Sequence, residues 1–212
     1  MPELIKKSTK RSEKKRERKI YLCNVGRTET YNITFNLMND GYVKTEDYMG
    51  NKNLTRDEIL SWYESRKGID KKVPDESFAI VRHPIGRIES HVKWAVYYGK
   101  THRKENGFFD FINYSIDNLF EEDFCRNIVP AFDSILFDAT VFQYELGVRR
   151  ISDFFVENKI VEKWTRIVSK KDEESLKVDW SKCPDSLRDK ILKTYDQDFE
   201  AFDYDPDDYF KA

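Results

Sequence analysis

Residues 78–90 have the sequence Phe78-Ala-Ile-Val-Arg82-His-Pro-Ile-Gly-Arg87-Ile-Glu-Ser90, in which a short apolar run leads straight into a helical pattern. The run from Ser77 to Val81 is typical of a buried strand. A helix is predicted from Pro84 to about Tyr98, because apolar residues recur there on one face and proline suits a first helical turn. The strand thus delivers Arg82 to the carboxyl edge of a sheet, where open α/β proteins bind their ligands.

Short apolar runs and longer helical patterns alternate along the rest of the chain, which predicts an α/β protein with a mostly parallel sheet. Further strands are expected at residues 19–25 and 139–142. Further helices are expected at residues 28–38, 54–67, 108–124 and 146–156, and after Pro184, where one stripe contains Leu187, Ile191, Tyr195 and Phe199. Residues 164–179 are charged and irregular, which predicts a loop that acts as a lid.

With 212 residues and 39% hydrophobic side chains the chain can bury a core, which excludes the disordered, collagen-like and disulfide-scaffold classes. The charge is unevenly distributed, because residues 1–19 carry nine Lys or Arg against three Glu while the whole chain has a net charge of −2. Residues 1–18 are therefore predicted to be a flexible basic arm, and residues 19–212 a single domain. The arm suits a nucleic acid or another acidic partner, but a solvated tail explains it more simply.

No metal centre is expected from the sequence. Cys23, Cys125 and Cys183 lie far apart and form no CxxC pair, and the three histidines form no HExxH or HxH pattern. No apolar run is long enough to span a bilayer, and charges occupy the amino-terminal segment where a signal peptide would need an apolar region. These features predict a cytoplasmic protein without a membrane partner.

Arg82, Arg87 and Ser90 surround the predicted start of the helix at Pro84. Two guanidinium groups, a hydroxyl and the positive end of a helix dipole suit a phosphate group. In the alternative interpretation, both arginines pair with acids of this acidic domain, and Ser90 is merely tolerated in the helix. Spacing alone does not separate the two interpretations.

A second candidate for anion binding follows the first expected strand, at Val25-Gly-Arg-Thr-Glu-Thr-Tyr31. A strand, a tight turn and a helix in this order let backbone N–H groups surround an anion, with Arg27, Thr28 and Thr30 as side-chain donors. The segment is not a Walker A loop, since the GxxxxGK[ST] pattern is absent. The alternative is that Thr28 or Thr30 is the N-cap of the helix and binds no ligand.

The two segments, in this order, resemble motifs of the sulfotransferase family, in particular its carbohydrate sulfotransferase branch. That family has a phosphosulfate loop of the PKTGGTS or PKSGTT type after its first strand and a later R-P-R-S block. Residues 82–90 are similar to the block, with the first Arg and the Ser eight positions apart. Residues 141–145 and 195–204 are similar to two further stretches of the family, so the resemblance covers roughly residues 19–204.

The resemblance implies a P-loop-like three-layer fold and a sulfotransferase that uses 3′-phosphoadenosine-5′-phosphosulfate as cosubstrate and needs no metal. The sulfuryl group would pass to a hydroxyl or amine of an unknown acceptor, for example a carbohydrate. The residues implied at the donor are Gly26, Arg27, Thr28 and Thr30 around the 5′-phosphosulfate, and Arg82, Arg87 and Ser90 around the 3′-phosphate. Arg27 would also stabilise the leaving group. The candidates for the general base are Glu46, which we favour, Asp47, Glu29 and His91.

Two departures from the family pattern keep other functions open. Arg27 stands in place of the usual Lys, and Glu29 and Thr30 stand in place of the Gly pair. A carboxylate beside an anion loop suits a binding module that has lost catalysis, and a P-loop-type small-molecule kinase is the other alternative. Lys170 and Lys171 would close over the donor, as basic loops do in the family. Aromatic residues that would stack on an acceptor, with core packing as the alternative, are Trp62, Tyr63, Trp94, Tyr97 and Tyr98.

Overall fold

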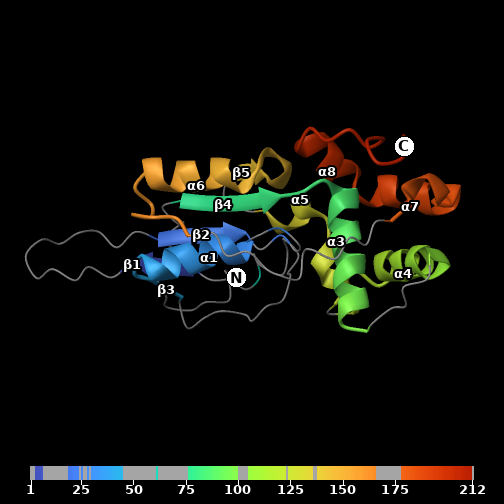
Figure 1. Ribbon diagram of the computed structural model, residues 1–212, viewed down its shortest axis with the longest axis horizontal. Helices are drawn as coiled ribbons and strands as arrows, with labels where there is room; N and C mark the ends of the chain where they lie inside the picture. The colour runs from blue at the N-terminus through green and yellow to red at the C-terminus, as the bar shows by residue number, and fades with distance from the viewer. Residues whose placement is uncertain are drawn as a thin grey trace, which may run out of the picture.

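The structure is a computed structural model that describes residues 3–6, 19–23, 25, 28, 30–44, 61, 76–99, 105–122, 124–135, 138–165 and 178–211. The strands within these residues are β1 (Glu3–Lys6), β2 (Lys19–Cys23), β3 (Tyr42–Lys44), β4 (Glu76–Val81) and β5 (Thr140–Gln143). They form one sheet in the order β3-β1-β2-β4-β5, in which β2, β4 and β5 are parallel and β1 is antiparallel to both of its neighbours. The chain thus has a mixed α/β fold with a small three-stranded parallel sheet flanked by helices (Figure 1).

The three parallel strands confirm the strands expected from the sequence, with small shifts at their ends. β1 and β3 are additional, and they extend the sheet beyond its parallel part. β1 lies in the segment predicted to be a flexible arm, where Leu4 is paired with Ile20 of β2. Residues 7–18 of that predicted arm lie outside the described residues.

The described α-helices are α1 (Thr30–Asn39), α3 (Pro84–Tyr97), α4 (Glu105–Asp117), α5 (Ala131–Ser134), α6 (Val148–Glu157), α7 (Asp185–Thr194) and α8 (Asp196–Ala201). Short 3-10 helices are η1 (Cys125–Ile128), η2 (Tyr144–Leu146) and η4 (Trp180–Lys182). α1, α3 and α6 confirm three of the expected helices. The helix expected at 54–67 lies outside the described residues apart from Ser61, as does most of the predicted lid.

Two expected helices are shorter in the structure. α4 ends at Asp117 rather than at Phe124, and turns connect it to η1. The last expected helix is divided into α7 and α8 at Tyr195, whose φ of −115° and ψ of 20° depart from helical values. The buried Tyr195 hydroxyl donates to the carbonyl of Ile128 at 2.6 Å, a long-range contact that a local sequence pattern does not indicate.

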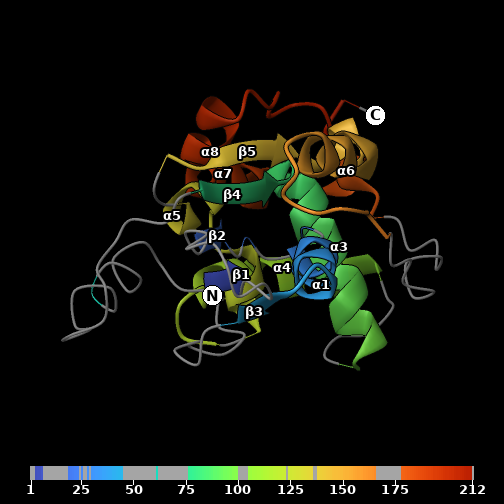
Figure 2. The ribbon, with the colours of Figure 1, turned by 90° about the vertical axis from the view of Figure 1, so that its left-hand side faces the viewer.

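Helices lie on both sides of the sheet. Alternate residues of β2 and β4 form one apolar face: Ile20, Leu22, Phe78 and Ile80. α1 and α6 both pack on this face (Figure 2). α5 lies on the opposite side at the carboxyl ends of the strands, where Ala131 packs with Val25 and Val81.

A second apolar core lies beyond the end of β4 (Figure 1). Ile85, Ile88 and Val92 of α3 are buried there against α4 and α7, as their spacing predicted. The stripe predicted after Pro184 is also buried in this core: Leu187, Ile191, Tyr195 and Phe199. α3 therefore links the sheet to the helical core, because it starts directly after β4 and its apolar face enters the second cluster.

Two buried groups that lose a proton only at alkaline pH, the Cys125 thiol and the Tyr195 phenol, predict a loss of stability at high pH. Burial raises the pKa of the Cys125 thiol from 9.0 to about 11, and burial also raises the pKa of the Tyr195 phenol. Both groups keep their protons in the folded protein at a pH at which the unfolded chain loses them. The free energy of unfolding is therefore expected to fall as the pH rises from about 9 towards 11.

Urea unfolding between pH 7 and about pH 10.5 checks this expectation. The midpoint is expected to be constant near neutral pH and to fall above about pH 9. Cys125→Ala is expected to make the fall shallower, by up to about 1.4 kcal/mol per pH unit. A wild-type midpoint that does not change across this range would contradict the role assigned to the buried acids.

Candidate functional site

β2 and β4 end side by side at the carboxyl edge of the sheet. Cys23 is paired with Ala79 in the parallel register, and Val25 and Val81, which follow, share one buried cluster. The segments after the two strands, which carry the two predicted anion-binding motifs, therefore begin next to each other. Five predicted residues of this region lie outside the described part of the chain: Gly26, Arg27, Glu29, Glu46 and Asp47.

Thr28 and Thr30 are the predicted donors of the first motif that the structure describes. Thr28 is buried, and its hydroxyl donates to the carbonyl oxygen of Val25 at 2.7 Å. This hydrogen bond ties the loop back to the end of β2. Thr30 is the first residue of α1, so the strand, loop and helix follow one another as expected. The contact of both threonines with a 5′-phosphate stays a prediction.

Arg87 does not belong to the binding site, and its assignment there is corrected. Its side chain is fully buried, one terminal nitrogen donates to the carbonyl of Val129, and the other lies 3.5 Å from the Asp198 carboxylate. The centre of the Tyr195 ring lies 5.9 Å from the guanidinium carbon. Arg87 therefore follows the alternative interpretation, in which an arginine of this block pairs with an acid of the same domain.

Asp198 of α8 is the acid that compensates Arg87. Its two oxygens accept hydrogen bonds from the backbone N–H groups of Ala131 and Phe132, each at 2.8 Å. These N–H groups open α5, so one carboxylate both caps a helix and pairs with a buried guanidinium. Sequence reasoning missed this role, because Asp198 is one of many acids in the acidic C-terminal segment and nothing local distinguishes it.

Arg82 has a different environment from Arg87. It is half-buried at the end of β4, and its guanidinium carbon lies 4.7 Å from the centre of the Tyr144 ring. Among the residues that the structure describes, no carboxylate pairs with Arg82 and no oxygen accepts a hydrogen bond from it. A cation–π contact leaves the N–H groups in the guanidinium plane available. An uncompensated arginine at this edge of the sheet is suited to hold an anion.

Ser90 lies on the same side of α3 as Gly86, one turn further along the helix. A Cβ on Gly86 would lie 3.2 Å from Nε of Arg82, so the Arg82 side chain leans over this side of α3. Ser90 is half-buried, and its hydroxyl makes no hydrogen bond within the described part of the chain. Arg82 and Ser90 therefore offer donors along one side of the helix, and their contact with a phosphate stays a prediction.

The start of α3 is occupied by a carboxylate of the chain itself. The two oxygens of Glu145 accept hydrogen bonds from the backbone N–H of His83 and from the hydroxyl of Tyr204, each at 2.9 Å. Burial, and then the Glu145 charge, raise the pKa of Tyr204 well above its usual range. The N–H of the residue that caps α3 is therefore taken by Glu145, and the binding of a phosphate at this helix start stays a prediction.

His83 connects the start of α3 to the turn that follows α8. Its Nδ1 accepts the backbone N–H of Ile85 at 3.3 Å, and its Nε2 lies 3.0 Å from the carbonyl oxygen of Asp205. Since Nδ1 accepts, the ring proton belongs on Nε2, which donates it to Asp205. Nothing in the sequence pattern around His83 indicates this connecting role.

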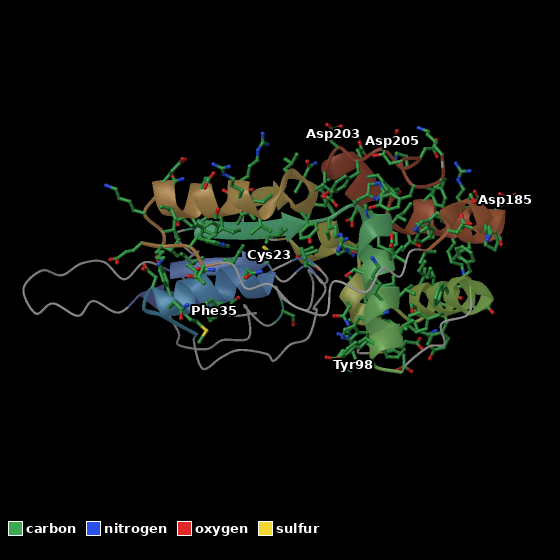
Figure 3. All side chains as sticks on the ribbon, in the orientation of Figure 1. Cys23, Phe35, Tyr98, Asp185, Asp203 and Asp205 are labelled. Carbon is green, nitrogen blue, oxygen red and sulfur yellow. The ribbon has the colours of Figure 1, made fainter. Side chains whose placement is uncertain are left out.

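His91 and the nearby aromatic residues of α3 do not join these groups. His91 is fully buried, with the rings of Trp94 and Phe111 at 5.7 and 5.4 Å. Its candidacy as the general base is therefore corrected, because the ring is packed in an aromatic stack. Tyr97 and Tyr98 are exposed, and Tyr98 lies at the end of α3 that is far from Asp205 (Figure 3). Four other predicted residues lie outside the described ranges: Trp62, Tyr63, Lys170 and Lys171.

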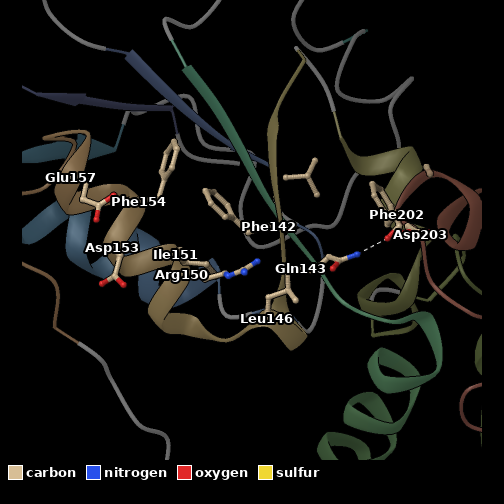
Figure 4. Close-up of a pocket in the computed structure, with 12 residues that line it drawn as sticks. Phe142, Gln143, Leu146, Arg150, Ile151, Asp153, Phe154, Glu157, Phe202 and Asp203 are labelled. Carbon is tan, nitrogen blue, oxygen red and sulfur yellow. Dashed lines mark hydrogen bonds between the residues drawn. The ribbon is translucent and has the colours of Figure 1, made fainter.

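A pocket of about 700 Å³ lies between β5, α6 and the turn after α8 (Figure 4). Phe142, Leu146 and Phe154 are among its apolar lining residues. Charged side chains of α6 also line the pocket. Gln143 of β5 donates to the carbonyl oxygen of Phe202 at 2.6 Å, which links the strand to the turn. The predicted donor-site residues that the structure describes do not line this pocket, and no sequence motif indicated it.

The described residues contain neither a metal-binding cluster nor a membrane-spanning helix, and no related protein was found that would assign a function to this site. Within the described ranges, no group of three or more His, Cys, Asp or Glu side chains is placed to hold a metal ion. None of the helices described there combines the length and the apolar character needed to cross a membrane. Comparisons of the chain with protein-family models, with curated proteins and with solved structures gave no match.

Proposed function

We propose that the protein is a sulfotransferase that moves a sulfuryl group from 3′-phosphoadenosine-5′-phosphosulfate to a hydroxyl or amine. The observation that carries this proposal is the half-buried Arg82, which has no acid partner within the described residues and shares one side of α3 with the Ser90 hydroxyl. A partly buried guanidinium without an ion pair or a hydrogen-bond acceptor is unfavourable, and a phosphate group supplies both the charge and the acceptor oxygens. The resemblance of residues 82–90 to the family block assigns this anion to the 3′-phosphate of the donor.

The end of β2, which lies next to that of β4, supports a site for the 5′-phosphosulfate half of the donor. Parallel pairing ends β2 and β4 at one edge of the sheet, where Val25 and Val81 share a buried cluster, and α1 begins at Thr30. A strand, a loop and a helix next to a second parallel strand are the elements of the P-loop-like fold that we propose for this sheet. Gly26, Arg27 and Thr28 would then lie around the 5′-phosphosulfate.

The proposed reaction is an in-line displacement at sulfur. A bond forms between the acceptor oxygen or nitrogen and sulfur, and the bond between sulfur and the 5′-phosphate oxygen breaks with its electron pair on the phosphate. Arg27 would stabilise this charge, and Glu46 would take the proton of the acceptor. Arg82 and Ser90 would hold the 3′-phosphate and so keep the donor in line with the acceptor. The second product is adenosine 3′,5′-bisphosphate.

Adenosine 3′,5′-bisphosphate is the probe that tests this proposal. A ligand at 100 times its Kd stabilises the folded state by about 2.7 kcal/mol, which raises the melting temperature by several degrees. We expect this rise with adenosine 3′,5′-bisphosphate and a much smaller one with adenosine 5′-monophosphate at the same concentration. A rise only with ATP and Mg²⁺ would replace the proposal by the kinase alternative. No response to any of these nucleotides, together with retention on DNA, would replace it by the binding module.

A further inference from the structure

The turn that follows α8 returns over the start of α3, and several contacts hold it there. Asp207 accepts a hydrogen bond from Arg188 of α7 at 2.7 Å, and the same guanidinium lies 4.8 Å from the centre of the Phe210 ring. Phe210 also packs edge-on against Trp180, with ring centres 5.9 Å apart. These contacts involve residues on both sides of Tyr209 in the sequence, so they hold the backbone of Tyr209 in place.

The Tyr209 side chain lies over Gly86, in the first turn of α3. Its phenol oxygen is 2.8 Å from the position that a Cβ on Gly86 would take, and Nε of Arg82 is 3.2 Å from the same position. The hydroxyl and Nε of Arg82 therefore both lie close to one point beside the helix. The methyl group of an alanine at this position would force the hydroxyl to shift.

The hydroxyl of Tyr209 is available to a ligand. The side chain is half-buried, and its ring centre lies 4.7 Å from that of His83, which keeps the ring in place. The Tyr204 hydroxyl is used by Glu145, whereas that of Tyr209 forms no hydrogen bond with any residue that the structure describes. Burial raises the pKa of Tyr209, so the group carries its proton at neutral pH and acts as a donor.

We propose that Tyr209 is a third residue of the donor site and donates a hydrogen bond to the same phosphate that Arg82 and Ser90 hold. This inference rests on the proposed function. The three terminal oxygens of a phosphate monoester are enough to accept from a guanidinium, an alcohol and a phenol. Tyr209 lies outside residues 19–204, to which the family resemblance extends. Its hydroxyl would favour nucleotides with a 3′-phosphate over those without one.

Tyr209→Phe removes the hydroxyl and keeps the ring that packs on His83. Titration calorimetry of the full chain with adenosine 3′,5′-bisphosphate is expected to show binding about tenfold weaker than in the wild type, as for the loss of one hydrogen bond to a charged group. Binding of adenosine 5′-monophosphate, which lacks the 3′-phosphate, is expected to be unchanged. Tyr114→Phe is the matched control, because Tyr114 is exposed on α4, and it is expected to alter neither affinity.

The possible results separate this inference from the proposed function. If the wild type does not bind adenosine 3′,5′-bisphosphate, the proposed function fails, and the inference fails with it. If the wild type binds and Tyr209→Phe binds equally well, or loses affinity equally for both nucleotides, the inference alone is overturned. Tyr209→Met provides a second variant should Tyr209→Phe not fold, because a flexible apolar side chain can pack on His83 without supplying a hydroxyl. It is expected to weaken binding of the bisphosphate selectively, and equal affinity for the bisphosphate would likewise overturn the inference.

Discussion

Arg82→Ala is expected to weaken the binding of adenosine 3′,5′-bisphosphate about 100-fold. The substitution removes a guanidinium that has no other counter-charge among the described residues, and a bidentate pair of charge-assisted hydrogen bonds to phosphate contributes about 3 kcal/mol. Because the Arg82 side chain caps no helix and pairs with no acid within those residues, the melting temperature without ligand is expected to change little. Titration calorimetry and thermal unfolding of the same sample measure both effects.

Two further variants define the role of Arg82. Arg82→Lys keeps the charge but loses the planar fork and the contact with the Tyr144 ring, so an intermediate loss of about tenfold is expected. Arg149→Ala removes an equally charged side chain that is exposed on α6, and no loss is expected. Affinity that is unaffected in Arg82→Ala would contradict the assignment of the 3′-phosphate to this residue.

Asp198→Ala is expected to destabilise the folded protein by about 3–5 kcal/mol. It leaves the fully buried Arg87 guanidinium without its carboxylate, and removing one partner of a buried ion pair has a cost of this size. It also removes the acceptor for the Ala131 and Phe132 N–H groups at the start of α5. Urea unfolding at neutral pH measures the free-energy difference.

Glu200→Ala is the matched control for Asp198→Ala, since Glu200 is an exposed acid on the same short helix. It is expected to change the free energy of unfolding by less than about 0.5 kcal/mol. Asp198→Asn is expected to destabilise nearly as much as Asp198→Ala, because a neutral amide does not compensate the Arg87 charge. A loss below about 1 kcal/mol in Asp198→Ala would show that water or another group replaces the carboxylate.

The elements predicted best from sequence are those whose signals are local. α3 begins at Pro84 as expected, because proline fits the first turn and the apolar spacing from Ile85 to Val92 matches a helical period. The position of Arg82 at the end of a buried strand follows from the same pattern. The pairing of this strand with β2 follows from the usual arrangement of parallel α/β units.

Elements that depend on distant partners were missed. β1 contains only Leu4 and Ile5 between charged residues, so its sequence looks like that of a charged arm. Only its pairing with β2 and β3 identifies it as a strand. The break between α7 and α8 contains no glycine or proline. It occurs at Tyr195, whose hydroxyl reaches Ile128, a contact between segments that are far apart in the chain.

The two arginines of the 82–90 block illustrate the same limit for the candidate site. Arg82 and Arg87 have the same chemistry and lie in one motif, and spacing favours neither as the ligand-binding residue. The difference arises from Asp198, which reaches Arg87 from the other end of the chain and leaves Arg82 uncompensated. This difference depends on the folded structure. The sequence alone could therefore state both interpretations of the two arginines, phosphate binding and pairing with an acid, but could not choose between them.

The turn after α8 also bears on the order of events during biosynthesis. Tyr204 and Asp205 bond to Glu145 and His83 at the first turn of α3, yet they leave the ribosome after the whole sheet has been made. Because protein segments emerge and fold from the amino end, a nascent chain that stops before this turn would have α3 without the contacts that define its start. Docking of this turn on the first turn of α3 would therefore come late in synthesis, after the sheet and α3 have emerged.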